Sequence, residues 1–228
     1  MERKRRFVTV VVVALAIFGA MFASDDMWQQ TVSYQGPKVT TDGPAIELLD
    51  ELAIKGRASK TNYSREQFGG GWSSHDGCDT RNIILSRDLT NVAVGSGCSV
   101  TSGVLSDPYT GQTIQFQRGA STSSDVQIDH VVALSDAWQK GAQNLTRDRR
   151  EQLANDPLEL LAVDGPANQQ KSGSDAASWL PSNRAFRCQY TARQIAVKAK
   201  YELWVTQAEY DAIKSVLSRC PGQILPSA

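Results

Sequence analysis

An aspartate and a histidine stand side by side in the segment "VQIDHVVALSDAW", residues 126–138, among apolar and β-branched residues. A carboxylate can hold a divalent cation and an imidazole can take a proton from water, so Asp129 and His130 together suit metal-assisted hydrolysis. Side chains of adjacent residues on a regular strand point to opposite faces. The two can share a pocket only where a strand ends or bulges, and we expect such a point here.

A second polar group follows the next apolar run, in "LELLAVDGPANQQKSGSD", residues 158–175. The pattern predicts a strand over 158–163 and then a helix, on which Asn168 and Lys171 would be neighbours because they are three residues apart. Asn168 can give a carbonyl oxygen to a hard cation, and Lys171 can give a charge to a phosphate. Alone, such an asparagine is more often a helix cap, and a histidine like His130 is more often part of a core.

The order of these segments resembles a known family. A strand ending in "DH", an insertion, the strand "LELLAV" and the helix "NQQK" resemble the HNH superfamily with its ββα-metal fold. The stretches "CDTRNIILSRDL", "DHVVAL" and "ANQQKSG" look like exported bacterial HNH proteins related to the C-terminal domain of GmrSD-type restriction nucleases. The resemblance covers about residues 45–220. It implies an α+β fold with a ββα-metal core and C-terminal helices.

The same resemblance implies roles for four residues. His130 takes the place of the general-base histidine, and Asp129 and Asn168 take the places of ligands to one divalent cation, Mg²⁺ or Mn²⁺. Lys171 matches a lysine that is common after the second ligand. The implied function is that of a metal-dependent endonuclease that cuts phosphodiester bonds in DNA or RNA, with DNA as the expected partner.

The middle asparagine of the HNH pattern is missing at its usual place, which holds Glu159. A glutamate could still orient the imidazole by accepting its second N–H, or Asn155 could do so from the preceding turn. This departure, with the acidic balance described below, favours a rival interpretation. In it, the chain is a cell-surface binding module that keeps the scaffold without turnover.

Phosphate-binding residues are expected on a basic face in the C-terminal part. Between Arg184 and Arg219 the chain has seven Lys or Arg residues against three acids. Arg193 and Lys198 are the candidates there, although a basic helix is most often simply a solvated face. Arg81 lies in a stretch that the family shares and is a further candidate, or a partner for an acid.

The N-terminus predicts export. "MERKRR" is basic and is followed by an apolar run of 17 residues, 7–23, which is either a cleaved signal peptide or a retained membrane anchor. Residues 24–43 are expected to be a linker and residues 44–228 the nuclease-like domain, a monomer. Loss of 1–23 would remove four of 24 basic and one of 24 acidic residues, leaving a slightly acidic body that needs a local basic patch to bind nucleic acid.

Four cysteines in the exported part, with no CxxC pair, predict disulfides rather than a metal site. Three connectivities are possible, and pairing by proximity would join Cys78 to Cys98 and Cys188 to Cys220. This pairing would close one loop in each half of the chain.

Other patterns predict the surrounding elements. They are a helix over 44–54, short β segments over 80–116 with a hairpin turn at "SDPYTGQTI", helical structure over 134–156 and two helices between Arg193 and Arg219. The last helix is expected to begin at a capping box formed by Thr206 and Glu209.

Overall fold

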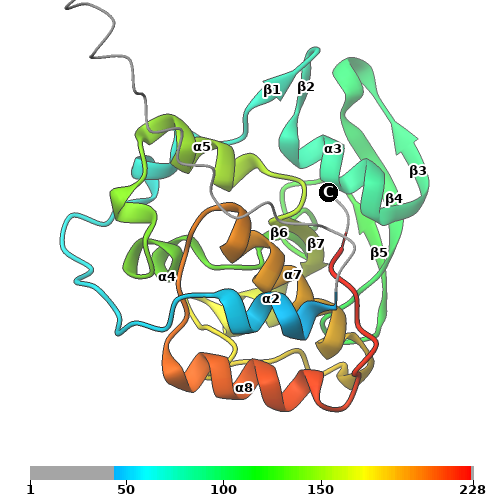
Figure 1. Ribbon diagram of the computed structural model, residues 1–228. Coiled ribbons are helices and arrows are strands. Elements are labelled where there is room, and N and C mark those ends of the chain that lie inside the picture. The colour runs from blue at the N-terminus through cyan, green and yellow to red at the C-terminus, as the bar shows by residue number, and fades with distance from the viewer. Residues whose placement is uncertain (1–43, 227–228) are drawn as a thin grey trace, which may run out of the picture. The chain divides into compact units, whose positions relative to one another are not determined.

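The expected strand–strand–helix unit lies at the centre of the chain, in a computed structural model of the protein (Figure 1). β6 (Val126–His130) pairs antiparallel with β7 (Leu160–Asp164), and α6 (Gly165–Lys171) follows at once. His130 lies opposite Leu160, at the last pair of the ladder. The aspartate–histidine pair therefore stands at a strand end, as the alternation of side chains required.

The structure describes residues 44–226. The signal peptide or anchor expected at 1–23 and the linker expected at 24–43 lie outside the described residues. Among the described helices, none is long and apolar enough to cross a membrane.

Three short helices fill the insertion between β6 and β7. They are α4 (Leu134–Gln139), the 3-10 turn η4 (Ala142–Asn144) and α5 (Arg147–Asn155), which together match the helical structure expected over 134–156. The side chain of Thr146 begins α5 by accepting a hydrogen bond from the N–H of Arg149 at 3.2 Å. The C-terminal end of α5 returns the chain to β7 beside the end of β6.

A three-stranded antiparallel sheet forms one flank, in the order β3 (Leu89–Val94), β4 (Val100–Ser106) and β5 (Thr113–Gln117). The hairpin turn expected at "SDPYTGQTI" connects β4 to β5. Gly103 in β4 lets the Leu89 side chain approach closely, because a Cβ there would meet its Cδ2 at 2.7 Å and displace it.

The first part of the stretch expected to be β-rich is instead a helix, α3 (Thr80–Asp88). The carboxylate of Asp79 accepts the N–H of Asn82 at 2.7 Å and so caps the helix. Ile84 and Leu85 are then fully buried against the sheet. Capping and burial outweigh the β propensity of the isoleucines, which is a weak preference by comparison.

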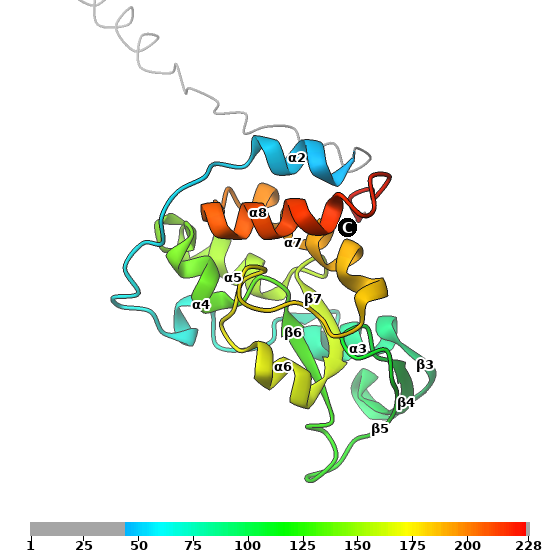
Figure 2. The same ribbon diagram turned by 90° about the horizontal axis from the view of Figure 1, so that it is seen from below.

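Helices α2 (Ala45–Glu51), α7 (Arg187–Lys200) and α8 (Gln207–Leu217) form the other flank and pack on one another (Figure 2). Their contact buries the main hydrophobic core, which includes Leu49, Ile195 and Ile213. The β6–β7 strand pair lies between these helices and the three-stranded sheet in both views.

The two predicted disulfides are present and the described residues hold no free cysteine. Cys78 in β2 (Cys78–Asp79) is bonded to Cys98, and Cys188 at the start of α7 is bonded to Cys220 beyond α8. The pairing by proximity is confirmed. Each bond restricts the unfolded chain by closing a loop, which stabilises the fold by a few kcal/mol in typical cases, ~2–4 kcal/mol.

A buried ion network joins the helical flank to the insertion. Lys140 contacts carboxylates of α4, of the loop after α6 and of α8, at 2.9 Å to Asp136, 2.8 Å to Asp175 and 2.6 Å to Glu209. Lys198 of α7 lies 3.1 Å from Glu209 and 3.6 Å from Asp136. We call these residues, with Arg57 at its edge, the ion network.

The ion network corrects two expectations. Lys198 is not on a basic surface, because its side chain is fully buried and its charge is compensated by Glu209 and Asp136. The capping box at α8 is half formed: Thr206 accepts the N–H of Glu209 at 3.2 Å, but the Glu209 carboxylate points to the two lysines instead of back to Thr206.

Candidate active site

The His130 imidazole is held in one orientation by a backbone carbonyl. The side chain is buried, with 6% of the residue exposed, and its Nε2 lies 3.0 Å from the carbonyl oxygen of Ala154 at the end of α5. A carbonyl only accepts hydrogen bonds, so Nε2 carries the proton and Nδ1 is the free acceptor. Within the described residues, no hydrogen bond reaches Nδ1. The site thus presents an unprotonated nitrogen on a fixed ring.

The electrostatic environment keeps this imidazole neutral. Burial, together with the positive charges of Arg65 and Lys171, lowers the pKa of His130 to about 3, although the Ala154 carbonyl favours the protonated ring. A phosphodiester bound beside the ring would bring a negative charge that opposes both cations. The pKa of His130 would then rise toward the range in which an imidazole accepts a proton efficiently.

The indole of Trp72 covers one face of the imidazole. The two rings are nearly parallel, at 7° and with centroids 5.8 Å apart. The backbone next to Trp72 is fixed by Asn155, whose Oδ1 accepts the N–H of Ser73 at 2.8 Å while its Nδ2 donates to the carbonyl of Glu151. Asn155 therefore acts on the segment that carries Trp72.

Glu159 makes no hydrogen bond to the imidazole. Its carboxylate accepts the N–H of Val132 at 3.1 and 3.2 Å, and its carbonyl accepts the N–H of Val131. The side chain is fully buried, and burial raises its pKa well above the usual value. Glu159 thus holds the turn after β6. The orienting role that the sequence offered to Glu159 or Asn155 is filled by the carbonyl of Ala154.

The Asp129 carboxylate is held by two buried donors. One oxygen accepts the hydroxyl of Tyr109, and the other lies 3.0 Å from Lys171 Nζ, which also donates to the His130 carbonyl at 2.8 Å. Burial raises the pKa of Asp129, and the lysine charge acts against this. Lys171 is fully buried, so the structure places it as the partner of Asp129 and not at a phosphate-binding surface.

Asp129, His130 and Asn168 line one cavity of about 340 Å³. Asn168 is half-buried on α6, and its Nδ2 donates to Gln127 at 2.9 Å, which leaves its amide oxygen free of any hydrogen bond within the described residues. The structure thus brings together the three residues that the sequence led us to expect as base and cation ligands.

The oxygen atoms of Asp129 and Asn168 fit one hard cation that takes only a few ligands from the protein. Each carboxylate oxygen of Asp129 has a second lone pair beyond the one already used, and the Asn168 oxygen is free. Mg²⁺ is usually held by one or two carboxylates together with water and substrate phosphates. The described residues contain no cluster of three or more His, Cys, Asp or Glu side chains that could form a complete cage. A cation here would depend on water and substrate for its remaining ligands.

A second cavity, of about 290 Å³, borders the same imidazole. It is lined by Trp72, by the glycines at 69–71 and by Ala154. Arg65, in the 3-10 turn η2 (Arg65–Phe68), lines both cavities. His130 and Arg65 therefore each line both cavities.

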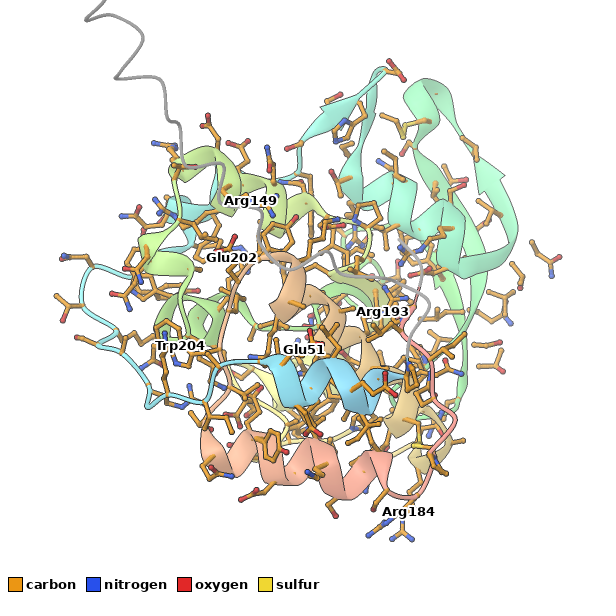
Figure 3. All side chains as sticks on the ribbon, viewed as in Figure 1. Glu51, Arg149, Arg184, Arg193, Glu202 and Trp204 are labelled. Carbon is orange, nitrogen blue, oxygen red and sulfur yellow. A yellow bond between two sulfur atoms is a disulfide. The ribbon has the colours of Figure 1, made fainter. Side chains whose placement is uncertain are left out.

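The other expected substrate contacts are engaged in the fold. Arg81 donates to the carbonyls of Ser123 and Val126, and Arg193 donates to the carbonyl of Leu158 at 2.8 Å. Burial lowers the pKa of both guanidinium groups. With Lys198 in the ion network, the basic surface expected from the C-terminal sequence is not formed by these residues. Figure 3 shows the contrast with Arg184, whose side chain extends beyond the ribbon.

Sequence reasoning missed three side chains at this site. Tyr109 comes from the hairpin turn between β4 and β5, where a tyrosine is normally expected to be exposed, yet it is fully buried. Trp72 and Arg65 lie within the range of the resemblance but before the first stretch that was quoted for it. The one local feature that could have drawn attention to Trp72 is the glycine run at 69–71. Gly69 and Gly71 adopt φ of 101° and 130° beside it, which favours glycine.

Comparison with known proteins places these residues in context. The family described as "GmrSD restriction endonucleases, C-terminal domain" matches residues 79–216. A protein of Arthroderma benhamiae (strain ATCC MYA-4681 / CBS 112371), named "Uncharacterized secreted protein", is 38% identical over 187 residues, which cover 81% of this chain and 88% of that protein. No solved structure matches. Asp129, His130 and Asn168 lie inside the matched segment, whereas Arg65 and Trp72 lie before it.

Proposed function

Because the chain belongs to the family of GmrSD restriction endonuclease C-terminal domains, we propose that it is an exported, metal-dependent nuclease that hydrolyses phosphodiester bonds in DNA with His130 as general base. One observation carries this proposal. The buried imidazole is neutral, its Nε2 is fixed by the Ala154 carbonyl, and its Nδ1 is free beside the cavity that holds Asp129 and Asn168.

The proposed chemistry uses this free nitrogen. Nδ1 of His130 takes a proton from water as the water oxygen forms a bond to phosphorus, and the bond from phosphorus to the departing sugar oxygen breaks. The positive charge gained by the ring is delocalised, and the Ala154 carbonyl stabilises it through Nε2. Positioned proton transfer of this kind typically contributes about 10²–10⁴-fold to the rate.

Asp129 and Asn168 would hold the divalent cation, Mg²⁺ or Mn²⁺. When bound, it would neutralise charge on the phosphate and on the leaving oxygen. Lys171 and Tyr109 position the Asp129 carboxylate and limit its negative charge. The cation affinity of the free protein is therefore expected to be low and to increase when a phosphate is bound.

Export is supported by two observations. All four cysteines form disulfides, which persist in oxidising compartments, and the relative at 38% identity is named a secreted protein. The substrate would then be nucleic acid outside the cytoplasm.

A second function remains on the same scaffold, that of a nucleic-acid-binding module without turnover. The observation that favours it is the pairing of Asp129 with Lys171, which leaves this pair without net charge. Binding of a cation would be weak in that case, and the site would hold a phosphate without cutting it.

Nicking of supercoiled DNA distinguishes the two functions. The full chain should relax the plasmid with Mg²⁺ or Mn²⁺ and should not do so with EDTA. His130→Ala should abolish nicking, while His75→Ala serves as a matched control, since His75 is the other histidine and is exposed on β1 (Ser74–His75). Equal nicking by His130→Ala and His75→Ala, or nicking undiminished by EDTA, would contradict the proposed function.

A further inference from the structure

Arg65 is set apart from the other arginines around the site. It is exposed, it lines both cavities beside His130, and within the described residues its side chain makes no ion pair or hydrogen bond. Arg81, Arg150 and Arg193, by contrast, donate to backbone carbonyls. A guanidinium has five N–H donors, and those of Arg65 are all available to a ligand.

The backbone that carries Arg65 is held on both sides. Arg150 Nε donates to the carbonyl of Gln67 at 2.8 Å, and Trp138 Nε1 donates to the carbonyl of Thr61. Phe68, three residues after Arg65, is buried edge-to-face against Trp138. The guanidinium is therefore presented by a packed turn at a defined place, and its freedom is limited to its own side chain.

Arg65 lies at the end of the site that holds the imidazole. It lines the larger cavity together with His130 and Tyr63. Lys60 lines that cavity too, with its ammonium group 5.3 Å from the ring centroid of Tyr63. The mouth of the larger cavity thus carries two cations, whereas the one anion inside it, Asp129, is paired with Lys171.

We propose that the Arg65 guanidinium binds the phosphodiester group that is cut, by donating two hydrogen bonds to its non-bridging oxygens. This inference rests on the proposed function. A phosphate at the junction of the two cavities would lie against His130, and the strand would continue into a cavity on each side. Arginine suits this place because its planar fork matches two phosphate oxygens at once.

The family match does not contain this residue. Residues 79–216 supply the general base and the cation ligands, whereas the segment from Lys60 to Trp72 supplies the phosphate contact and one wall of the smaller cavity. Substrate binding in this chain is therefore divided between the matched segment and the preceding turn.

Binding and cleavage by variants of the full chain test this inference. Arg65→Ala and Arg65→Lys are compared with Arg184→Ala, a control at an exposed arginine of η5 (Arg184–Phe186) whose side chain makes no ion pair or hydrogen bond within residues 44–226. The probe is a fluorescent single-stranded DNA, and its Kd is measured in EDTA at several salt concentrations. The KM and kcat for cleavage are measured with Mn²⁺.

We expect Arg65→Ala to raise Kd and KM by about tenfold and to reduce the salt dependence of binding by about one phosphate contact. Arg65→Lys should recover part of the loss, and Arg184→Ala should match the wild type. If the wild type cleaves DNA and Arg65→Ala equals Arg184→Ala in Kd and KM, the assignment of Arg65 is wrong while the nuclease stands. If the wild type binds without cleaving and only Arg65→Ala loses binding, Arg65 is still a phosphate contact, but the nuclease function is contradicted.

Discussion

The described residues contain two buried clusters in which lysines pair with carboxylates, and the two differ in whether they border a cavity beside His130. In the ion network, Lys140 and Lys198 are fully enclosed, and every ammonium faces carboxylates of Asp136, Asp175 or Glu209. With Arg57, three cations meet three anions. The group joins α4, α7 and α8 and borders neither of the two cavities beside His130.

The pair of Asp129 and Lys171 is buried to a similar extent but stands at a cavity wall. Beside it are two acceptors without a hydrogen bond among the described residues, namely His130 Nδ1 and the amide oxygen of Asn168. Buried charge alone therefore does not identify a functional site in this fold. The His130 site differs from the ion network because its acceptors without a hydrogen bond face a cavity. We therefore expect substitutions at the His130 site to lower activity and substitutions in the ion network to lower stability.

The largest effect is expected at His130. His130→Ala should lower kcat/KM by about 10²–10⁴-fold, because the proton acceptor is removed. The free energy of unfolding should change far less, since the ring makes a single hydrogen bond among the described residues and lines two cavities. Plasmid nicking and urea unfolding of the same preparation give both values. A variant that loses stability and activity in proportion would mean that the imidazole belongs to the core.

The opposite result is expected in the ion network. Lys198→Met leaves the carboxylates of Glu209 and Asp136 partly uncompensated, and loss of one partner from a buried pair costs about 3–5 kcal/mol. The activity of the molecules that remain folded should equal that of the wild type. Lys200→Met is the matched control, because the Lys200 side chain is 38% exposed and its pair with Asp156 should contribute at most about 1 kcal/mol. A specific loss of DNA binding in Lys198→Met would restore Lys198 as a substrate contact.

A smaller effect is expected at the support of the imidazole. Asn155→Ala removes the acceptor of the Ser73 N–H and releases the backbone next to Trp72, which stacks on His130. We expect a loss of about tenfold in kcat, below the ~100-fold that a misplacement of 1 Å can cost. Trp72→Ala should cause a similar loss. If Asn155 acts through Trp72, the double variant should lose little more than either single one, whereas additive losses would show that the two act separately.

The sequence predicted the parts of the site that follow from order along the chain. The β6–β7–α6 unit, the strand end at His130 and the proximity of Asn168 depend on local periodicity and on short connections, which a sequence displays. The disulfides were predicted for the same reason, because each joins cysteines that are close in the chain.

The rest depends on contacts between distant segments. Trp72 reaches His130 and Tyr109 reaches Asp129 across intervening elements, and nothing in "GGGW" or "DPYTG" indicates those partners. The basic residues of the C-terminal helices were expected to be exposed because charges usually are. Lys198 is buried since three acids from separate elements converge on it and on Lys140, which no count of charges along the sequence can indicate.

The smallest predicted effect is a dependence of stability on pH that comes from the edge of the ion network. Burial would raise the pKa of Asp175, but the hydrogen bond and charge of Lys140, with help from Ser178 and Arg57, outweigh it and lower the pKa to about 2. A carboxylate with a lowered pKa in the folded state contributes stability that is full above its unfolded value, near 3.8, and is lost as pH falls toward 2. Wild-type Tm should therefore fall between pH 4 and pH 2 by several degrees more than the Tm of Asp175→Asn, which starts lower but lacks this titration. Scanning calorimetry of both proteins across that range measures the difference. Parallel curves of Tm against pH would mean that Lys140 does not stabilise the Asp175 carboxylate. The ion network would then not be fully paired, and the contrast with the His130 site would be weaker.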